Sequence, residues 1–514
     1  MKPIKLLSGF MTVGFWTLAS RILGFAREIL IAALIGPGPV LDAFVAAFRL
    51  PNLFRRFFAE GAFNAAFVPM FSKRLEGDDN PKGFAQDALN LLAAAVLTLT
   101  ALGMIFMPAL VWATAGGFVG DARFDLTVDY GRVMFPYILC MSLAALFSGI
   151  LNATGRFAAA AAAPVLLNIF ACLTMGLAAV LGGEVVERLV WVIPMAGVAQ
   201  LALVWFAAAK AGISLRLGLP RWTPEMRHML SVALPAALAM GVTQVNLVVG
   251  QLAASGYENA VSWLFIADRL YQLPLGVVGI AVGIVLLPDL SRRLRAGDET
   301  GAQAALSRAG EFSLFLTVPS AIAFMAIPIP LVSVMYERGA TGPEDTAAIA
   351  LAVAIYGAGL PAFVLQKVLQ PLYFAREDTR SPFRFALVAM VVNAALAVGL
   401  LPVFGWISPA IAASAAGWVM VACLWWGTRS MGTAAQFDSR FKTRALRILA
   451  ASLVMGAAVM VVWQLSAPAF GLPYWRYLAL LALILFGAVV YFAAGRAFGA
   501  FRLAEFKSAL RRGA

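Results

Sequence analysis

Charged residues, histidine and cysteine are all scarce in this chain of 514 residues. Charged residues make up only 13% of it, and His228 is the single histidine. Soluble domains carry about 25% charged residues, so the composition excludes a soluble globular enzyme and a disordered tail. With a single histidine, a histidine-rich metal site or a Ser-His-Asp triad is close to excluded, and we expect neither a metal nor a cofactor. The three cysteines are odd in number, lie in separate apolar runs and are expected to be small buried hydrophobic residues: Cys140, Cys172 and Cys423.

Long apolar runs occupy most of the sequence. Hydrophobic residues make up 62% of the chain, and the mean hydropathy is +0.87. A helix needs about 20 mainly apolar residues to cross the hydrocarbon core of a membrane. Fourteen stretches reach this length, so the sequence predicts an all-α polytopic membrane protein with fourteen transmembrane helices. The stretches are residues 10–35, 41–71, 85–114, 127–151, 158–182, 188–209, 229–254, 259–290, 310–336, 346–374, 385–402, 406–428, 445–466 and 473–498.

Basic residues mark one side of the membrane. The net charge is +13, and in a polytopic protein such an excess sets the orientation, so we expect no nucleic-acid partner. With the N-terminus in the cytoplasm, 27 of the 39 lysines and arginines fall in the termini and the connections on that side. Only four arginines fall in connections on the opposite side, which predicts that both termini are cytoplasmic: Arg123, Arg188, Arg338 and Arg476.

A motif recurs in the second and eighth predicted spans. Arg49-Leu50 precedes P-M-F-S-K-R-L at residues 69–75, and Arg269-Leu270 precedes P-D-L-S-R-R-L at residues 288–294. The two arginines are 220 residues apart, which is six spans, so both copies have the same orientation in the membrane. The pattern predicts two six-helix lobes related by a parallel repeat, plus two C-terminal helices. We expect these parts at residues 1–220, 221–435 and 436–514.

Charged side chains lie inside several of the predicted spans, where each costs a few kcal/mol, and three of these spans carry the candidate site. At 100° per residue, the members on the second span share one face of a helix, with Arg55 at its edge. The candidate site residues are Arg21, Arg27 and Glu28 on the first span, Asp42, Arg49, Asn52, Arg55, Arg56 and Glu60 on the second, and Asp268 and Arg269 on the eighth.

Two interpretations fit these buried charges. In one, ion pairs hold the helices together, with Glu28 and Glu60 as partners. In the other, a hydrated cationic cavity lies between two six-helix lobes. Arginines outnumber acidic residues at membrane depth, and pairing alone does not need that surplus. A polyanionic substrate does, because the planar guanidinium fork suits phosphate oxygens. The surplus favours the cavity, whereas Glu60 and Asp268 fit orienting arginines as well as touching substrate.

Several of these residues stand in longer recognisable motifs. They are S-R-I-L-G-F-A-R-E at residues 20–28, D-A-F at 42–44, R-L-P-N-L-F-R-R-F-F-A-E-G-A-F at 49–63, and A-D-R-L at 267–270 before P-L-G at 274–276. With these motifs the chain resembles, over its whole length, the MurJ (MviN) lipid II flippases of the multidrug/oligosaccharidyl-lipid/polysaccharide (MOP) exporter superfamily. Some relatives carry lysine where this chain has Arg49, and some carry aspartate where it has Glu28.

The resemblance implies a fold and an activity. The fold is a V-shaped pair of six-helix lobes, with two C-terminal helices that form a groove for a lipid tail. The activity is movement of lipid II, an undecaprenyl-diphosphate-linked disaccharide-pentapeptide, from the inner to the outer leaflet of the bacterial cytoplasmic membrane by alternating access. By motif position, the substrate-binding arginines are Arg21, Arg27, Arg55 and Arg269. The expected partners are lipid II and membrane lipids, with a monomeric chain that contacts the cell-wall synthesis machinery.

Of two alternative functions, one remains open on physical grounds and the other lacks features that it would need. Another MOP-type flippase for polyprenyl-linked oligosaccharides would also need a basic cavity, and only the motifs argue against it. A membrane enzyme acting on polyprenyl phosphates belongs to a different class. It would need a cluster of carboxylates or histidines at one membrane face and a long outer loop, and the sequence offers neither.

Overall fold

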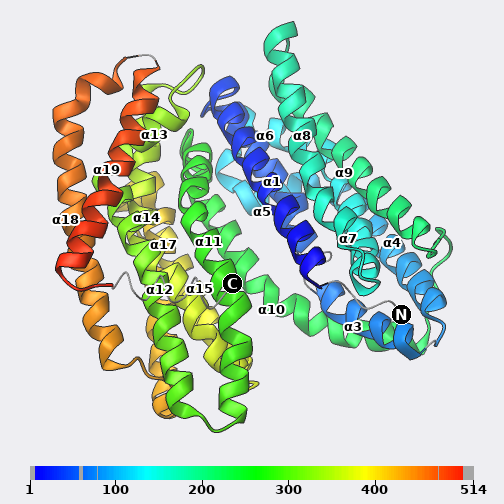
Figure 1. Cartoon of the computed structure of the whole chain (residues 1–514). Helices are drawn as coiled ribbons and strands as arrows, with labels where there is room; N and C mark the ends of the chain where they lie inside the picture. The colour runs from blue at the N-terminus through cyan, green and yellow to red at the C-terminus, as the bar shows by residue number, and fades with distance from the viewer. Residues whose placement is uncertain (1–5, 57–61, 78, 473, 502–514) are drawn as a thin grey trace. The chain divides into compact units, whose positions relative to one another are not determined.

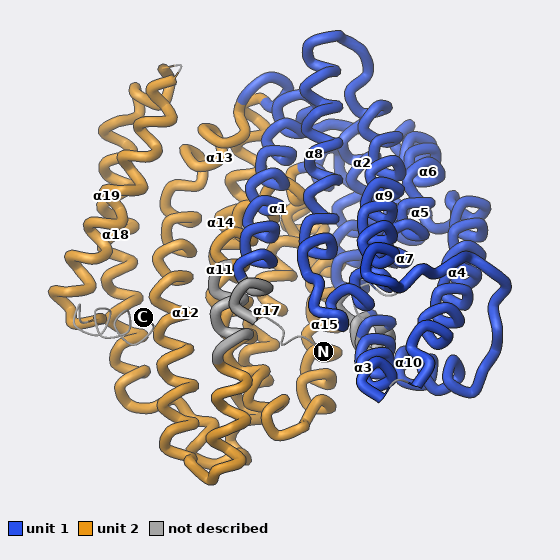
Figure 2. Tube along the Cα trace, turned by 45° about the vertical axis from the view of Figure 1, so that its right-hand side comes forward, with its two compact units in different colours: residues 1–262, 338–341 blue, residues 263–337, 342–514 orange. Residues whose placement is uncertain are grey.

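The structure is a computed structural model that describes residues 6–56, 62–77, 79–472 and 474–501. Within these ranges every regular element is a helix, and the chain divides into two compact units, coloured separately in Figure 2. Unit 1 comprises residues 1–262 and 338–341, and unit 2 comprises residues 263–337 and 342–514.

Unit 1 contains the first ten helices and a short 3-10 turn. They are α1 (Leu6–Leu34), α2 (Pro39–Arg55), α3 (Ala62–Gly77), α4 (Pro81–Ile105), α5 (Met107–Ala115), η2 (Gly116–Phe118), α6 (Ala122–Met134), α7 (Tyr137–Ala153), α8 (Phe157–Leu181), α9 (Val185–Lys210) and α10 (Pro224–Ser255). Within this unit α8 packs between α1 and α9, α7 packs on α9, α2 on α6 and α3 on α10.

Unit 2 contains the remaining helices, except for the first residues of α11. They are α11 (Ala260–Arg295), α12 (Glu299–Ala326), α13 (Pro328–Tyr336), α14 (Pro343–Phe374), α15 (Arg380–Gly399), α16 (Leu401–Phe404), η3 (Gly405–Ile407), α17 (Ser408–Gly427), η4 (Thr428–Ser430), η5 (Thr433–Ala435), α18 (Ser439–Phe470) and α19 (Trp475–Ala497). Here α14 packs against α12 and α17, α15 packs on α17, and α18 lies between α12 and α19 (Figure 1).

Ten helical segments of the described ranges are long and apolar enough to cross a membrane, so the protein is an all-helical polytopic membrane protein. They are Pro81–Ile105, Ala122–Ala153, Phe157–Leu181, Val185–Lys210, Glu299–Ala326, Pro343–Phe374, Arg380–Gly399, Leu401–Ser430, Thr433–Phe470 and Trp475–Ala497. The helices that carry the candidate site residues, α1, α2 and α11, are not among these ten.

Prolines explain why the helices outnumber the predicted spans. The predicted span 85–114 is divided into α4 and α5 before Pro108, and the span 310–336 into α12 and α13 before Pro328. Proline has no N–H for the helical ladder and is tolerated in the first turn of a new helix. A count of apolar residues therefore predicts the length of a span but not an interruption within it.

The boundary between the units lies at residue 262, whereas the sequence places a boundary at 220. The intervening helix α10 packs within unit 1. Gln251 Nε2 donates to the Thr114 carbonyl over 3.2 Å, and the Gly117 N–H donates to Ser255 Oγ over 2.9 Å. A Cβ at Gly117 would collide with the backbone of residues 255 and 256, so this close approach needs glycine. The three-part division of the sequence stays a prediction.

Candidate functional site

The candidate residues on α1 lie beside α8. Glu28 is buried, and its Oε1 is 2.6 Å from the guanidinium of its neighbour Arg27. On the same helix the Ser20 carbonyl accepts a hydrogen bond from Asn168 Nδ2 of α8 over 3.0 Å. Arg21 is exposed. The sequence places Arg27 and Glu28 on the first predicted span, but it predicts neither their contact nor Asn168, an amide that lies in an otherwise apolar run.

The candidate residues on α2 are organised around Asn52. Its Nδ2 donates to the Phe48 carbonyl over 2.9 Å, and its Oδ1 accepts from Arg55 Nε over 3.3 Å. The side chain of Asn52 thereby joins the helix backbone to one arginine and limits the orientations open to that guanidinium. Arg49 is partly buried and Arg56 is exposed at the end of the helix. Glu60 lies outside the described residues.

Asp42 binds groups of unit 1 that sequence reasoning missed. Its carboxylate is fully buried, and its Oδ1 accepts from the backbone N–H of Ser262 at 2.8 Å and from the hydroxyl at 2.5 Å. Its Oδ2 lies 3.2 Å from Arg123 NH1. Because Ser262 lies in the first turn of α11, the carboxylate satisfies an N–H that the helix leaves unbonded.

Arg123 ties several segments together at this end of unit 1. Its Nε is 2.5 Å from Asp121 Oδ2, its NH1 donates to the Tyr257 carbonyl over 3.1 Å, and its guanidinium lies over the Phe118 ring at 4.5 Å. The backbone N–H of Arg123 also donates to Asp121, and this bond lowers the pKa of the Asp121 carboxyl. The sequence offered a signal for the importance of Arg123, because it is one of only four arginines in the connections predicted on the side opposite the cytoplasm.

Residues 338–341 also belong to unit 1. The Ala340 N–H donates to the Ala33 carbonyl over 2.9 Å, and Thr341 Oγ1 donates to the Ala32 carbonyl over 2.6 Å. Gly339 has a φ of +58°, a backbone conformation that favours glycine. The segment between α13 and α14 is therefore fixed to the C-terminal end of α1 by backbone and hydroxyl contacts.

In unit 2 the candidate residues lie on α11. The guanidinium of Arg269 lies over the ring of Phe265, 4.7 Å from its centroid and one helical turn away. The neighbouring carboxylate of Asp268 accepts a hydrogen bond from Gln272 and interacts with the hydroxyl of Tyr271. The contacts of Asp268 are thus with these two polar side chains. An aromatic side chain at i−4 was the sequence signal for the contact between Phe265 and Arg269.

Tyr271 belongs to an aromatic cluster beneath Asp268. Its ring centroid is 5.0 Å from that of Tyr356 and 5.5 Å from that of Phe363, both on α14. Packing of this kind fixes the ring and, through its hydroxyl, the carboxylate of Asp268. The candidate residues on α1 and α2 belong to unit 1 and Arg269 belongs to unit 2. Their convergence on one cavity stays a prediction.

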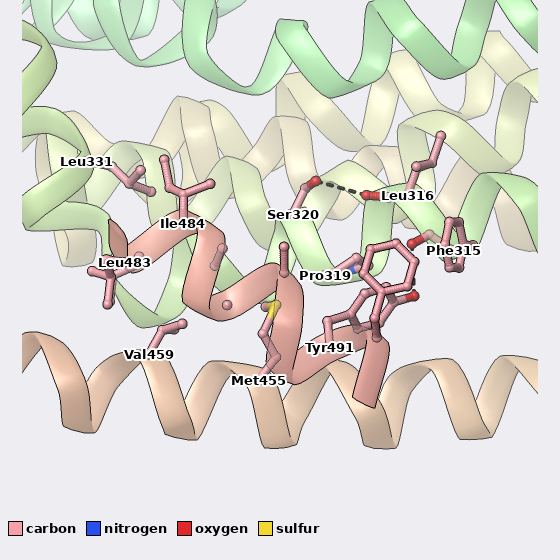
Figure 3. Close-up of a pocket in the computed structure, with 15 residues that line it drawn as sticks. Phe315, Leu316, Pro319, Ser320, Leu331, Met455, Val459, Leu483, Ile484 and Tyr491 are labelled. Atoms are coloured by element: carbon pink, nitrogen blue, oxygen red, sulfur yellow. Dashed lines mark hydrogen bonds between the residues drawn. The ribbon is translucent and has the colours of Figure 1, made fainter. Parts of the chain in front are cut away.

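An apolar pocket lies within unit 2 among α12, α13, α18 and α19 (Figure 3). Its volume is about 260 Å³. Two polar groups of its lining are satisfied by their own helices or neighbours: Ser320 Oγ donates to the Leu316 carbonyl over 2.8 Å and Tyr491 to the Phe315 carbonyl over 2.9 Å. With those groups occupied, the pocket offers a ligand mainly hydrocarbon, from residues such as Leu331, Met455, Val459, Leu483 and Ile484.

The described residues offer groups for two kinds of ligand. Guanidinium groups on α1, α2 and α11 can bind anions, and the pocket in unit 2 can hold hydrocarbon. Over the described ranges, no group of three His, Cys, Asp or Glu side chains is arranged to hold a metal ion.

Comparison with known proteins gives the family. The family model described as "Lipid II flippase MurJ" matches residues 31–486. A protein of Rhizobium tropici described as "Probable lipid II flippase MurJ" is 46% identical over 475 residues, covering 91% of this chain and 89% of the relative. A Rhizobium meliloti (strain 1021) protein with the same description is 44% identical over 529 residues, covering 99% and 97%.

Solved structures agree with this match. A lipid II flippase MurJ in an inward closed conformation superposes with a TM-score of 0.79 at 25% identity, covering 95% of this chain and 98% of that one. An inward-facing multidrug resistance MATE transporter of the MOP superfamily has a TM-score of 0.69 at 14% identity, covering 81% and 95%, which relates the folds alone. The chain belongs to the MurJ lipid II flippase family.

Proposed function

We propose that this protein moves lipid II from the inner to the outer leaflet of the bacterial cytoplasmic membrane. As a member of the family it is a transporter rather than an enzyme. The observation that carries the proposal is the set of arginines on α1, α2 and α11, at the depth of predicted spans, in a chain whose relatives of 44–46% identity are described as lipid II flippases.

The proposed topology has fourteen transmembrane helices with both termini in the cytoplasm. The ten candidate spans support it, and the remaining four spans correspond to the predicted stretches 10–35, 41–71, 229–254 and 259–290. The proposed lobes are residues 1–220 and 221–435, related by a parallel repeat, with the two additional helices in residues 436–514. The basic residues concentrated on one side support this orientation.

The proposed binding site for the head group is cationic. A diphosphate carries about two negative charges and does not cross hydrocarbon unaided. Guanidinium groups replace its hydration with charge-assisted hydrogen bonds. Arg21, Arg27, Arg55 and Arg269 bind the diphosphate in a central cavity, Arg49, Arg56 and Asn52 contribute to the same surface, and Glu28 orients Arg27. The contact between Asn52 and Arg55 supports such positioning.

The polyprenyl tail requires an apolar surface while the head group is bound. The pocket among α12, α13, α18 and α19 supplies one, and its polar lining groups are already hydrogen-bonded. We therefore place the tail along α18 and α19. Alternating access of the two lobes then exposes the head group first to the cytoplasm and then to the outside. The protein acts as a monomer and meets the cell-wall synthesis machinery at the membrane.

The leaflet location of lipid II tests this function. The protein is depleted in its native cells, and intact spheroplasts are treated with an impermeant enzyme that cleaves lipid II. Wild type, Arg269→Ala or the control Arg292→Ala is then added back. Arg292 is on the same helix, but its side chain is 76% exposed in the last turn.

We expect depletion to make lipid II inaccessible, and wild type and Arg292→Ala to restore cleavage. Arg269→Ala should fail to restore it. If lipid II stays accessible after depletion, another carrier dominates or the substrate is different, and another polyprenyl-linked oligosaccharide becomes the favoured substrate. If Arg269→Ala restores cleavage fully, the arginine site is wrong even where the substrate is right.

A further inference from the structure

The connection between α9 and α10 carries apolar and basic residues to which the proposed function assigns no role. Residues 213–223 contain no helix or strand and run from the end of α9 at Lys210 to the start of α10 at Pro224. Leu215, Leu217 and Leu219 occupy alternate positions in this segment, followed by Arg221 and Trp222. We refer to residues 213–223 as the linker.

The linker is fixed to α4 through its backbone. The side-chain amide of Gln86 bonds both backbone groups of Arg216: its Oε1 accepts from the N–H over 3.0 Å, and its Nε2 donates to the carbonyl. Asn90, one turn further along α4, accepts from the Gly218 N–H over 2.9 Å and from Gln86 Nε2 over 3.1 Å. Leu215 is 2% exposed. The start of the linker is thus a docked segment of defined position.

The large apolar side chains of the linker after Leu215 point away from the protein. Leu217 is 57% exposed, Leu219 is 86% exposed and Trp222 is 61% exposed. All lie within unit 1, and the neighbouring Arg216, Arg221 and Arg227 are also exposed. The exposed apolar side chains can therefore contact hydrocarbon, and the arginines beside them can bind anions.

The depth of the linker follows from the helices that flank it. The 25 residues of α4 extend about 37 Å at 1.5 Å per residue, which exceeds a hydrocarbon core of about 30 Å. Residues 91–115 contain no charged residue and are long enough to cross the core by themselves, whereas the first turns of α4 carry Lys82, Gln86, Asp87 and Asn90. The first turns of α4 therefore reach into the headgroup region. Extended backbone that faces lipid is excluded from the hydrocarbon itself, whereas tryptophan and arginine are favoured at its boundary.

We propose that the linker is a membrane-surface anchor that binds anionic phospholipid. Leu217, Leu219 and Trp222 insert at the boundary between headgroups and acyl chains, and Arg216, Arg221 and Arg227 bind phosphate groups of the same leaflet. Gln86 and Asn90 hold the backbone so that these side chains face the lipid. The anchor fixes the depth at which α9 continues into α10, and it does not depend on which cargo is transported.

Spin-label accessibility of the full-length protein in vesicles tests the anchor. A nitroxide is attached to Leu219→Cys after Cys140, Cys172 and Cys423 are replaced by alanine. Asp79→Cys is the aqueous reference, with a side chain 75% exposed on the same predicted side. Leu173→Cys on α8, 61% exposed within a candidate span, is the reference for hydrocarbon. Vesicles contain phosphatidylcholine alone or with phosphatidylglycerol.

With phosphatidylglycerol, we expect the ratio of oxygen to nickel-complex accessibility at residue 219 to lie several-fold above that at residue 79 and below that at residue 173. Arg216→Gln/Arg221→Gln should abolish the difference between the two lipid compositions. Gln86→Ala should release the linker and lower the ratio at residue 219. The proposal is overturned if the ratio at residue 219 equals that at residue 79 in both kinds of vesicle. It is also overturned if phosphatidylglycerol does not change the ratio at residue 219 while Arg216 and Arg221 are intact.

Discussion

At the scale of single residues, the buried charges divide into two kinds. Asp42 and Arg123 are each held by several fixed groups, among them Ser262, Asp121 and the Tyr257 carbonyl. Two of the arginines proposed to bind substrate contact a neighbour on the same helix: Arg55 contacts Asn52, and Arg269 contacts Phe265. The first kind stabilises the unit, whereas the second kind is proposed to bind the anion.

Neutralising Asp42 tests the structural kind. Asp42→Asn keeps one oxygen for Ser262 but removes the charge opposite Arg123, which is itself 4% exposed. Breaking a buried ion pair from one side costs about 3–5 kcal/mol, so we expect a clear fall in the melting temperature of the purified protein. Asp129→Asn, with a side chain 74% exposed, is the control and should melt as wild type does. Equal melting temperatures for the two variants would contradict a stabilising role for Asp42.

Replacing Phe265 tests the functional kind. Phe265→Leu removes the aromatic face beneath Arg269, and a cation–π contact contributes about 0.5–2 kcal/mol. We expect accessible lipid II to appear several-fold more slowly in the spheroplast assay, with the melting temperature little changed. Phe265→Tyr keeps the ring and should restore the rate. If Phe265→Tyr is as slow as Phe265→Leu, the ring does not position Arg269.

At the scale of helices, the hairpin of α18 and α19 is joined to α12 by charge as well as by hydrocarbon. Glu311 of α12 is 8% exposed and lies 2.9 Å from Arg308, 3.1 Å from Arg444 and 3.5 Å from Arg440. Two of these arginines belong to the first turns of α18. Glu311 thus offsets a cluster of cations, in which Arg308 also pairs with Asp438.

Removing that carboxylate should loosen the hairpin. Glu311→Gln leaves Arg308, Arg440 and Arg444 to repel one another, and we expect faster amide hydrogen exchange in the first turns of α18. Exchange in α15 and α17, which do not border Glu311, should stay as it is. Glu344→Gln, an exposed change in the first turn of α14, is the matched control. Unchanged exchange in α18 would show that the apolar contacts with α12 suffice.

At the scale of the whole molecule, apolar length and basic asymmetry predict an all-helical polytopic protein, and the structure and the family confirm that much. The interruptions before Pro108 and Pro328 were not predicted, because hydropathy does not register a missing N–H. The contacts of Arg27 with Glu28 and of Asn52 with Arg55 each join residues of one predicted span, but the sequence did not predict these partners. The partners of Asp42 lie 81 and 220 residues away, and spacing within one helix carries no information about contacts at that distance.

The distribution of basic residues over the whole chain predicts its orientation in the membrane. The side on which a residue lies then depends on whether an odd or an even number of spans precedes it. Three predicted spans separate residues 79 and 184, an odd number, and six separate residues 79 and 300, an even number. In protein whose three cysteines are replaced by alanine, Glu184→Cys should react with an impermeant maleimide on intact spheroplasts. Asp79→Cys and Thr300→Cys should react only after permeabilisation. The interval from 184 to 300 includes α10 and α11, which are not among the ten helical segments that are long and apolar enough to cross a membrane. Labelling of Thr300→Cys from outside would therefore mean that one of these two helices does not cross, and that the fourteen-span topology is wrong there.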